Sequence, residues 1–205
     1  IGCEGPTLTV RLYSRVPIEQ IDTVYADTDS HTSVQLLRVL LAELFGVNPT
    51  LIDYHAPEGV AQGEIADRPE AMLLIGDKVV TASPPAVVYP YQLDLGEAWL
   101  ELTGLPFVFA VWMARPNAEL GDLPRRLADR LDANLPQRVL IAERYAAGHG
   151  WPLDLAEHYL VDVMRYSIGP RELEAIGRFG KLLAKHGLIR HAPAQLDPWA
   201  YSGPR

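Results

Sequence analysis

The stretch "DTVYADTDSHTSVQLLRVLLAELFG", residues 22–46, constrains the fold most, because a strand-like run leads directly into a helical pattern. Its opening, "DTVYAD", has the composition of a short strand. From Ser33 onward, leucines recur at the spacing of one helix face, and Gly46 stands where a helix C-cap is expected. These leucines are Leu36, Leu37, Leu40, Leu41 and Leu44. A strand, a hydroxyl-rich turn and a helix in this order are typical of α/β domains.

Strand and helix patterns alternate over the rest of the first half of the chain. They predict a helix in "GEAWLELTG" (96–104) and strands in "TLTVRLYS" (7–14), "PTLIDYH" (49–55), "MLLI" (72–75) and "LPFVFAVWMAR" (105–115). The run 72–75 is apolar throughout, as expected for a strand covered on both faces.

The patterns from Pro116 onward are mostly helical. One helix is expected to end at Gly169 and the next to begin at Pro170, since proline suits a first helical turn. The tail from Arg190 has no periodicity and is expected to be loosely held. The sequence therefore predicts an α/β fold with a helical C-terminal region.

Charge and cysteine content narrow the classes of protein. With a formal net charge of −8, the chain lacks the excess of Lys and Arg that neutralises nucleic-acid phosphates, so no nucleic-acid partner is expected. No apolar run approaches the ~20 residues that a membrane span requires. The single cysteine, Cys3, excludes an internal disulfide and fits a reducing cytoplasm. Neither the cysteine nor the dispersed histidines have a metal-ligand spacing, so no metal is expected.

The chain opens at Ile1 in a glycine-rich segment, "IGCEGP", without the charged and apolar regions of a signal peptide. Because it begins without Met, we expect an upstream piece to belong to the protein. Residues of that piece would then help to line any site.

The residues Thr32-Ser33-Val34-Gln35 have two interpretations. They match a capping box, in which the Thr32 hydroxyl accepts from a backbone N–H and Gln35 reaches back. Alternatively, the free N–H groups of a helix N-terminus, together with these hydroxyls, form a seat for a carboxylate or phosphate. The pattern alone favours the cap and leaves the anion site open.

Gly76 and Asp77 come directly after the buried run 72–75, at the carboxyl end of the predicted strand. Sites in α/β sheets lie at such ends, and a glycine there permits a positive φ or a close approach of the backbone to a ligand. The simpler alternative is that Asp77 caps the next segment of the chain. No G-x-S-x-G, G-x-G-x-x-G or Walker sequence is present, so nothing indicates a cofactor.

Three strings in this order, "DTDSHTSVQLLRVLL", "AMLLIGDKVV" and "DLGEAWLELTGLPFVFAVW", resemble the chorismate dehydratases of the futalosine route to menaquinone. The resemblance runs from "IGCEGP" to about "AKHGLI". It implies a fold like that of type II periplasmic binding proteins, with two α/β lobes joined by crossing strands. On that map 1–14 is a hinge strand and remnant of lobe 1, 15–106 is lobe 2, and 107–205 returns to lobe 1. The strands within 7–14 and 107–115 are then the two crossing strands.

The resemblance also implies an activity: elimination of water from chorismate, without a cofactor, to give 3-[(1-carboxyvinyl)oxy]benzoate. The implied protein is a cytoplasmic monomer or homodimer. No general base is evident, and the family's catalytic candidates fall in the expected upstream piece. One hypothesis is that a carboxylate of the substrate itself takes the proton.

The resemblance assigns substrate binding in three groups. Thr32 and Ser33 are the carboxylate donors, and Gly76 and Asp77 line the facing strand end. The further members are Ser30, His31, Cys3 and Gly5.

Two alternatives remain. The sister enzyme, 1,4-dihydroxy-6-naphthoate synthase, carries a His-Glu pair where this chain has Gly76 and Asp77, and a glycine cannot accept a proton. That difference favours the dehydratase. A solute-binding protein of the same fold, with no chemistry, is the other alternative.

Overall fold

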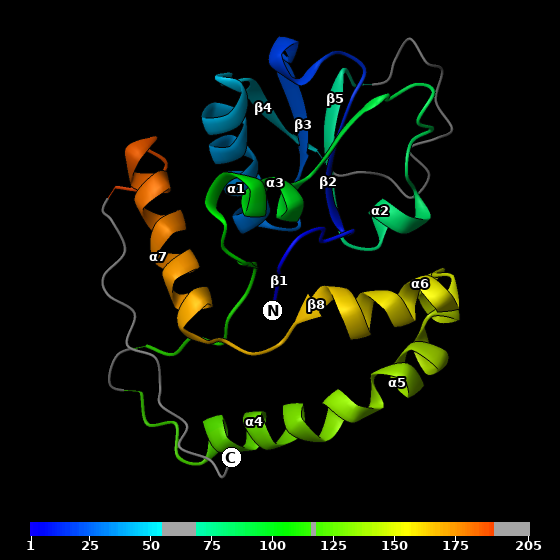
Figure 1. Cartoon of the computed structure of the whole chain (residues 1–205), viewed down its shortest axis with the longest axis vertical. Coiled ribbons are helices and arrows are strands. Elements are labelled where there is room, and N and C mark those ends of the chain that lie inside the picture. Colours follow the sequence, from blue (N-terminus) through cyan, green and yellow to red (C-terminus); the bar gives the residue numbers. More distant parts are fainter. Residues whose placement is uncertain (55–68, 116–117, 191–205) are drawn as a thin grey trace.

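The computed structural model describes residues 1–54, 69–115 and 118–190. The fold is mixed α/β, with one five-stranded sheet, one small three-stranded sheet and helices around them (Figure 1). The predicted fold class is confirmed at this level. The expectation for the tail beyond Arg190 lies outside the described residues.

The five-stranded sheet has the order β4-β3-β5-β2-β6, and the three-stranded sheet has the order β7-β1-β8. The strands are β1 (Gly2–Cys3), β2 (Val10–Ser14), β3 (Thr23–Asp27), β4 (Thr50–Tyr54), β5 (Ala71–Ile75), β6 (Tyr91–Asp94), β7 (Phe107–Val108) and β8 (Met164–Arg165). The α-helices are α1 (His31–Leu40), α2 (Lys78–Thr81), α3 (Leu95–Thr103), α4 (Leu123–Asn134), α5 (Arg138–Tyr145), α6 (Leu153–His158) and α7 (Pro170–Lys185).

The strand directions determine where side chains can gather. β3 runs parallel to both β4 and β5, with Ala26 opposite Leu73, whereas β2 is antiparallel to β5 and β6. The carboxyl ends of β3, β4 and β5 therefore meet at one edge of the sheet. The segments after β3 and β5 start from this edge.

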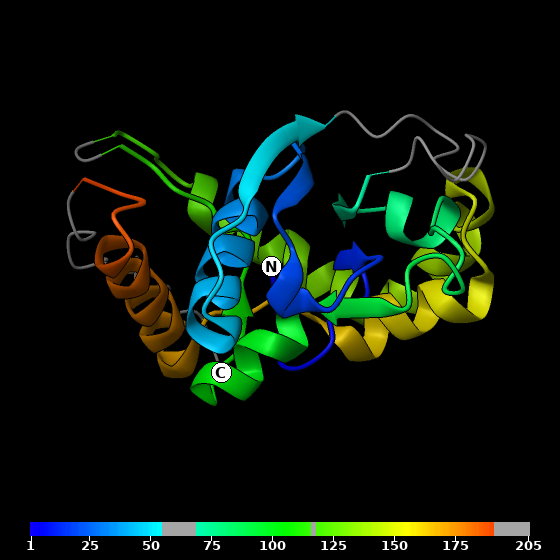
Figure 2. The same cartoon turned by 90° about the horizontal axis from the view of Figure 1, so that it is seen from above.

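The main core lies between one face of the five-stranded sheet and the helices α1, α3 and α7 (Figures 1 and 2). Trp99 of α3 is fully buried, donates its indole N–H to the Pro106 carbonyl over 3.0 Å, and packs edge-on against Phe107 and Phe179. A second cluster on the other face contains Met72 and Leu74 of β5. The predicted burial of β5 on both faces is thus confirmed.

The predicted helix after β3 is confirmed, and it continues as a π-helical turn over Leu41–Phe45 before ending at Gly46, whose φ is 68°. Two predictions in the second half were wrong in extent. The strand expected over 105–115 is confined to Phe107–Val108, because its partner β1 is only two residues long. The helix expected to reach Gly169 ends at Val163, and Met164 instead pairs with Cys3 in β8.

The chain passes between the two sheets at β1. Residues 7–14 were expected to form a crossing strand, but Val10–Ser14 lies inside the five-stranded sheet as β2. The strand that pairs with β7 is β1, with Cys3 opposite Phe107. β1 also pairs with β8, so the N-terminal residues join the first half of the chain to the C-terminal helices.

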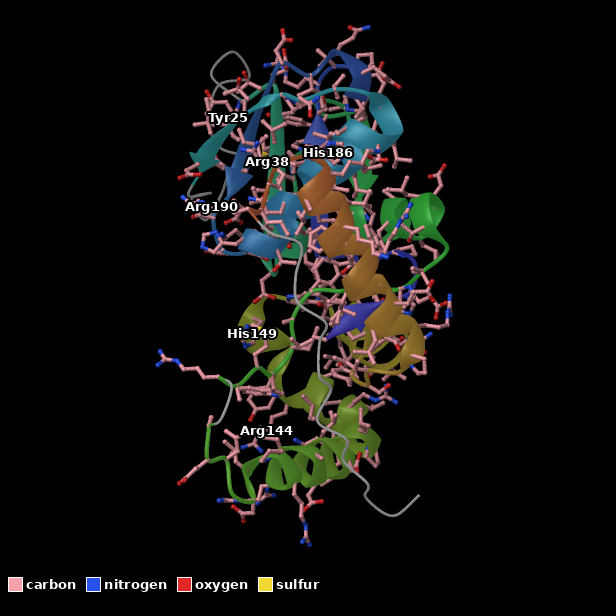
Figure 3. The ribbon with its side chains drawn as sticks, turned by 90° about the vertical axis from the view of Figure 1, so that its left-hand side faces the viewer. Tyr25, Arg38, Arg144, His149, His186 and Arg190 are labelled. Atoms are coloured by element: carbon pink, nitrogen blue, oxygen red, sulfur yellow. The ribbon has the colours of Figure 1, made fainter. Side chains whose placement is uncertain are left out.

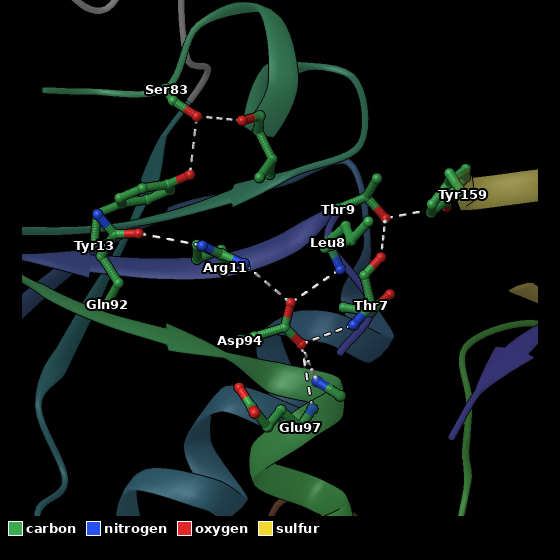
Figure 4. Close-up of polar contacts among 12 residues, drawn as sticks. Thr7, Leu8, Thr9, Arg11, Tyr13, Ser83, Gln92, Asp94, Glu97 and Tyr159 are labelled. Carbon is green, nitrogen blue, oxygen red and sulfur yellow. Dashed lines mark hydrogen bonds and ion pairs between the residues drawn. The ribbon is translucent and has the colours of Figure 1, made fainter. Parts of the chain in front are cut away.

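One carboxylate, that of Asp94, holds the segment between β1 and β2 in place through hydrogen bonds. Asp94, at the end of β6, accepts hydrogen bonds from the backbone N–H groups of Thr7 and Leu8, both over 2.9 Å (Figure 4). It also caps α3 by accepting from the N–H groups of Gly96 and Glu97. The Asp94 side chain is only 3% exposed. This single side chain therefore ties a loop, a strand end and a helix start together.

We expect Asp94→Ala to lower the free energy of unfolding by about 2–4 kcal/mol, because it removes a helix cap and leaves buried N–H donors without an acceptor. The matched control is Asp122→Ala, since Asp122 occupies the same N-cap position on α4 but its side chain makes no cap hydrogen bond. The control should change stability by less than about 0.5 kcal/mol. Urea unfolding followed by circular dichroism measures both, and equal losses would contradict the role assigned to Asp94.

Candidate functional site

The carboxyl-terminal edge of β3 and β5 brings together two segments that the sequence singled out. Lys78, directly after Asp77, extends its ammonium group to Asp27 and Asp29, with both N–O distances 2.7 Å. Burial alone would lower the pKa of Lys78, but the hydrogen bonds and charges of the two carboxylates outweigh it and raise that pKa. The turn after β3 and the turn after β5 are thus held side by side.

The helix cap at this edge differs from the predicted capping box. Ser30 is the N-cap of α1, and its hydroxyl accepts from the backbone N–H of Ser33 over 3.2 Å. Thr32 was expected to be the cap, but it lies inside the helix, because Ser30 is the residue with extended backbone geometry, at φ −144° and ψ 109°. The cap therefore lies upstream of its predicted position.

The displaced cap separates the roles of the hydroxyl residues. Ser33 is 1% exposed and donates its hydroxyl to Ser30, so it is part of the helix start. The Thr32 side chain is half-buried, with no hydrogen-bond partner among the residues that the structure describes. His31 is exposed in the same turn. Thr32 and His31 are therefore the side chains at this helix start that can turn toward a ligand.

Asp77 occupies the N-cap position of α2, as the simpler alternative expected, but its side chain does not cap the helix. Its carboxylate makes no cap hydrogen bond with α2. Instead, Oδ1 accepts from the indole N–H of Trp151 over 2.9 Å, and Oδ2 lies 3.1 Å from Nδ1 of His149. The preceding Gly76 has φ 74°, a left-handed conformation that glycine adopts without strain. The glycine turns the chain at the strand end so that Asp77 faces the C-terminal helices.

The turn between α5 and α6 presents the two partners of Asp77. After α5, a 3₁₀ turn covers Ala147–His149 and ends at Gly150, whose φ is 71°. A Cβ atom on Gly150 would lie 3.2 Å from the Thr81 methyl group, so this position requires a small residue as well as a positive φ. The backbone N–H of Trp151 then donates to the Ala146 carbonyl over 2.9 Å. His149 and Trp151 are thereby held on either side of the glycine.

A pocket of about 150 Å³ lies between Asp77 and the helices α5 and α6. Figure 3 shows His149 between the part that holds Tyr25 and Arg38, with the five-stranded sheet, and the part that holds Arg144 on α5. The pocket walls are mostly apolar or aromatic, with a few polar groups. The lining residues are Asp77, Ile141, Ala142, Tyr145, Ala146, His149, Trp151, Ala156, Tyr159 and Leu160. Apolar walls with a few polar groups are typical of small-molecule sites.

Tyr159 connects the pocket to the segment before β2. Its hydroxyl lies 3.1 Å from the Thr9 hydroxyl (Figure 4). Burial raises the pKa of Tyr159, the hydrogen bond with Thr9 lowers it, and the nearby Cys3 and Asp77 raise it further. The phenol therefore stays protonated and is available as a hydrogen-bond donor.

Cys3 and Gly5 do not line the pocket. Cys3 is 1% exposed in the main core, and burial raises the pKa of its thiol to about 12, with the negative charge of Asp94 adding to the effect. Gly5 is buried too, and its carbonyl oxygen faces Gly96 at the start of α3. The structure therefore places these two residues in the packing of the β1 joint, apart from the edge that carries Thr32 and Asp77.

Three residues at this pocket were not predicted from the sequence: His149, Trp151 and Tyr159. His149 lies 72 positions after Asp77, and no local spacing connects them. The available signal was a histidine flanked by glycines in "AGHGW", which indicates a turn that presents its side chains. Among the described residues, no group of three or more His, Cys, Asp or Glu side chains could hold a metal ion. No helix in that part of the chain is long and apolar enough to span a membrane.

The amino-acid sequence is similar to those of known proteins. A family model described as menaquinone biosynthesis matches residues 1–185. The chain belongs to this menaquinone biosynthesis family. A protein of Thermus thermophilus named chorismate dehydratase is 32% identical in an alignment of 171 residues that covers 76% of this chain and 61% of that protein. The resemblance predicted from the three strings is confirmed. The chain spans less than two thirds of the length of this curated relative.

The strings that resemble the menaquinone biosynthesis family occupy connected places in the structure. "DTDSHTS" is the end of β3 and the start of α1, and "LLIGD" is the end of β5 with its turn. "DLGEAW" carries Asp94 and the start of α3. The first two segments thus form the sheet edge beside the pocket. The third contains Asp94, which binds the backbone where the chain leaves β1.

The raised pKa of Cys3 leads to a prediction about its reactivity. The thiolate is the reactive form, so a thiol pKa of about 12 and near-complete burial should slow modification at pH 8 at least ~100-fold relative to the unfolded chain. Labelling with a chromogenic disulfide reagent, with and without guanidinium chloride, measures this ratio. Rapid labelling of the native protein would place Cys3 at an accessible site.

Proposed function

We propose that the protein is a chorismate dehydratase that eliminates water from chorismate, without a cofactor, to give 3-[(1-carboxyvinyl)oxy]benzoate for menaquinone biosynthesis. The observation that carries this proposal is the 32% identity to a protein of that name within a menaquinone biosynthesis family. The meeting of the α1 start with the β5 end beside a pocket supports it.

The proposed reaction requires the enzyme mainly to orient the substrate and to stabilise developing charge. Loss of one water makes the chorismate ring aromatic, so the enzyme has to hold two carboxylates and stabilise developing charge. The first turn of α1 has free backbone N–H groups and the positive end of a helix dipole. The Thr32 hydroxyl adds a donor there. We assign one substrate carboxylate to this turn.

The charged groups at this edge are paired with one another. Asp27 is buried and Asp29 is exposed, and the ammonium of Lys78 contacts both. One ammonium offsets part of the charge of the two carboxylates that precede α1, so in this proposal the donors for an anion are the backbone N–H groups of the helix start and the Thr32 hydroxyl. The same edge also contains four further residues that determine its shape: Gly76, Ser30, His31 and Ser33. The joint behind the edge contains Cys3 and Gly5.

We also propose that the fold is the two-lobed arrangement of type II periplasmic binding proteins. In this proposal 15–106 forms one lobe, while 1–14 and 107–205 supply the hinge and the C-terminal helices of the other. The pairing of β1 with β7 and β8 supports a joint at this place. Because β2 pairs with β5 and β6, we amend the boundary and assign residues 10–14 to the same lobe as 15–106, which leaves 1–9 as the hinge segment. The pocket beside Asp77 then lies between the lobes. Placement in the cytoplasm and a monomeric or dimeric state belong to the same proposal.

The direct test is incubation of the protein with chorismate and chromatography of the aromatic product. Release of 3-[(1-carboxyvinyl)oxy]benzoate together with one equivalent of water is the expected result. Binding of chorismate without product would show a solute-binding protein instead. If the protein neither binds chorismate nor forms the product, chorismate is excluded as its ligand.

We expect Thr32→Ala to lower kcat/KM for chorismate about 10- to 100-fold, because a hydrogen bond to a charged group contributes roughly 1.5–3 kcal/mol. Stability should change by less than about 0.5 kcal/mol, since Ser30 rather than Thr32 caps the helix. Thr50→Ala is the matched control, because Thr50 is exposed at the opposite end of the sheet, at the start of β4. Full activity of Thr32→Ala would place the carboxylate elsewhere.

A further inference from the structure

The pocket beside Asp77 has a polar rim and an apolar interior. Three exposed side chains form the rim, those of Asp77, His149 and Tyr145. The interior is formed by a small cluster of buried alanines and the side chains packed against it. The members of this cluster that line the pocket are Ala142, Ala146, Ala156, Trp151 and Leu160. The interior therefore suits an uncharged, apolar part of a ligand.

The volume of the pocket corresponds to one six-membered ring. It measures about 150 Å³. An apolar cavity of about 150 Å³ in a protein interior binds benzene. The alanines leave this space free, because Ala142 and Ala146 are buried and have the smallest side chains that carry a Cβ atom. A larger side chain at Ala142 would occupy the space of the ring.

Two aromatic side chains form adjoining walls of the pocket. The ring centroids of Trp151 and Tyr159 lie 5.1 Å apart, with 46° between the planes. Trp151 is anchored by its indole N–H, which donates to Asp77 over 2.9 Å, and the Tyr159 hydroxyl lies 3.1 Å from that of Thr9. Each ring is thus held by its polar atom. Contact between aromatic rings strengthens an interaction about 2- to 12-fold beyond the burial of area.

The charges at the pocket direct a carboxylate away from its interior. Burial raises the pKa of Tyr159, so its phenol stays uncharged. Among the described residues that line the pocket, Asp77 is the only Asp, Glu, Lys or Arg, and its charge repels a ligand carboxylate. The next residue, Lys78, binds Asp27 and Asp29 in the turn before α1. A ligand with its ring in the pocket therefore directs its carboxylates outward, along the sheet edge that carries the α1 start.

We propose that this pocket binds the six-membered ring of a carboxylate-bearing ligand, and that Trp151 and Tyr159 determine its specificity for a flat ring. This inference rests on the proposed function and adds to it the part of the site that recognises the ring of chorismate. Loss of water flattens that ring as it becomes aromatic. Walls that favour a flat ring therefore bind the developing product ring more strongly than the starting ring.

The binding test uses benzoate and cyclohexanecarboxylate, which has the same charge but a puckered ring. The chain has four tryptophans, so ¹⁵N-labelled protein gives few indole N–H signals, and Trp151→Phe identifies the signal of Trp151. Benzoate should shift this signal and bind about 2- to 12-fold more tightly than cyclohexanecarboxylate. A Trp151 signal that benzoate does not shift, or equal affinity for the two probes, would overturn the proposal.

The first variant removes an aromatic wall. Trp151→Leu should weaken benzoate binding and lower kcat/KM for chorismate, each about 2- to 12-fold. Trp112→Leu is the matched control, because Trp112 is 86% exposed and does not line the pocket. The control should change neither quantity. Equal effects of the two substitutions would show that Trp151 has no part in recognising the ring.

The second variant fills the pocket and keeps the test valid if Trp151→Leu folds poorly. Ala142→Leu should abolish benzoate binding, whereas the midpoint of urea unfolding should stay or rise, because the added groups occupy existing space. Wild-type affinity of Ala142→Leu for benzoate would contradict the proposal. A lowered midpoint would show that the space at Ala142 is not open to a ring, and this result counts against the pocket as well.

The two kinds of measurement separate this inference from the proposed function. If chorismate is not converted, but benzoate shifts the Trp151 signal and Ala142→Leu abolishes the shift, the substrate assignment fails and the ring pocket stands. If Ala142→Leu and Trp151→Leu convert chorismate at wild-type rates, the proposed function stands and the ring pocket is excluded.

Discussion

The carboxylate of Asp94 is the contact on which the arrangement of this molecule depends. It accepts from four backbone N–H groups, in Thr7, Leu8, Gly96 and Glu97, while Arg11 lies 3.5 Å from the same side chain. Leu8 has φ 62°, a left-handed conformation that costs about 1–2 kcal/mol in a residue with a side chain. The bond from the Leu8 N–H to Asp94 offsets that cost. The direction in which the chain leaves β1 and enters the five-stranded sheet results from this contact.

The parallel pairing of β3 with β5 positions the segments that form the candidate site. Because β3 and β5 run side by side in one direction, the turns after them meet at one edge, where Lys78 binds the carboxylates of Asp27 and Asp29. The residue before Lys78 is then directed to the C-terminal helices by a left-handed glycine. The edge in this way combines a helix N-terminus with a lysine whose ammonium is paired with two carboxylates.

The sequence predicted those parts of the fold and site whose cause is local. The apolar spacing over residues 33–44, the run 72–75 and the proline at 170 each specify an element by themselves. The extent of the strand after Pro106 was overestimated, because it depends on how many residues β1 offers as partner. The N-cap is Ser30 and not Thr32 as predicted. Both residue types suit an N-cap, and the backbone path of the turn after β3 determines which of them occupies it. His149 was not predicted, since its role arises from a contact with a residue far away in the sequence.

The joint between the two sheets is built from strands of two residues, β1, β7 and β8. Such short strands hold few backbone hydrogen bonds, so they resist rotation much less than the longer strands of the larger sheet. Side-chain contacts across the pocket, from Asp77 to His149 and Trp151 and from Thr9 to Tyr159, therefore add stiffness that the backbone lacks. These few bonds therefore contribute much of what holds the five-stranded sheet against the C-terminal helices.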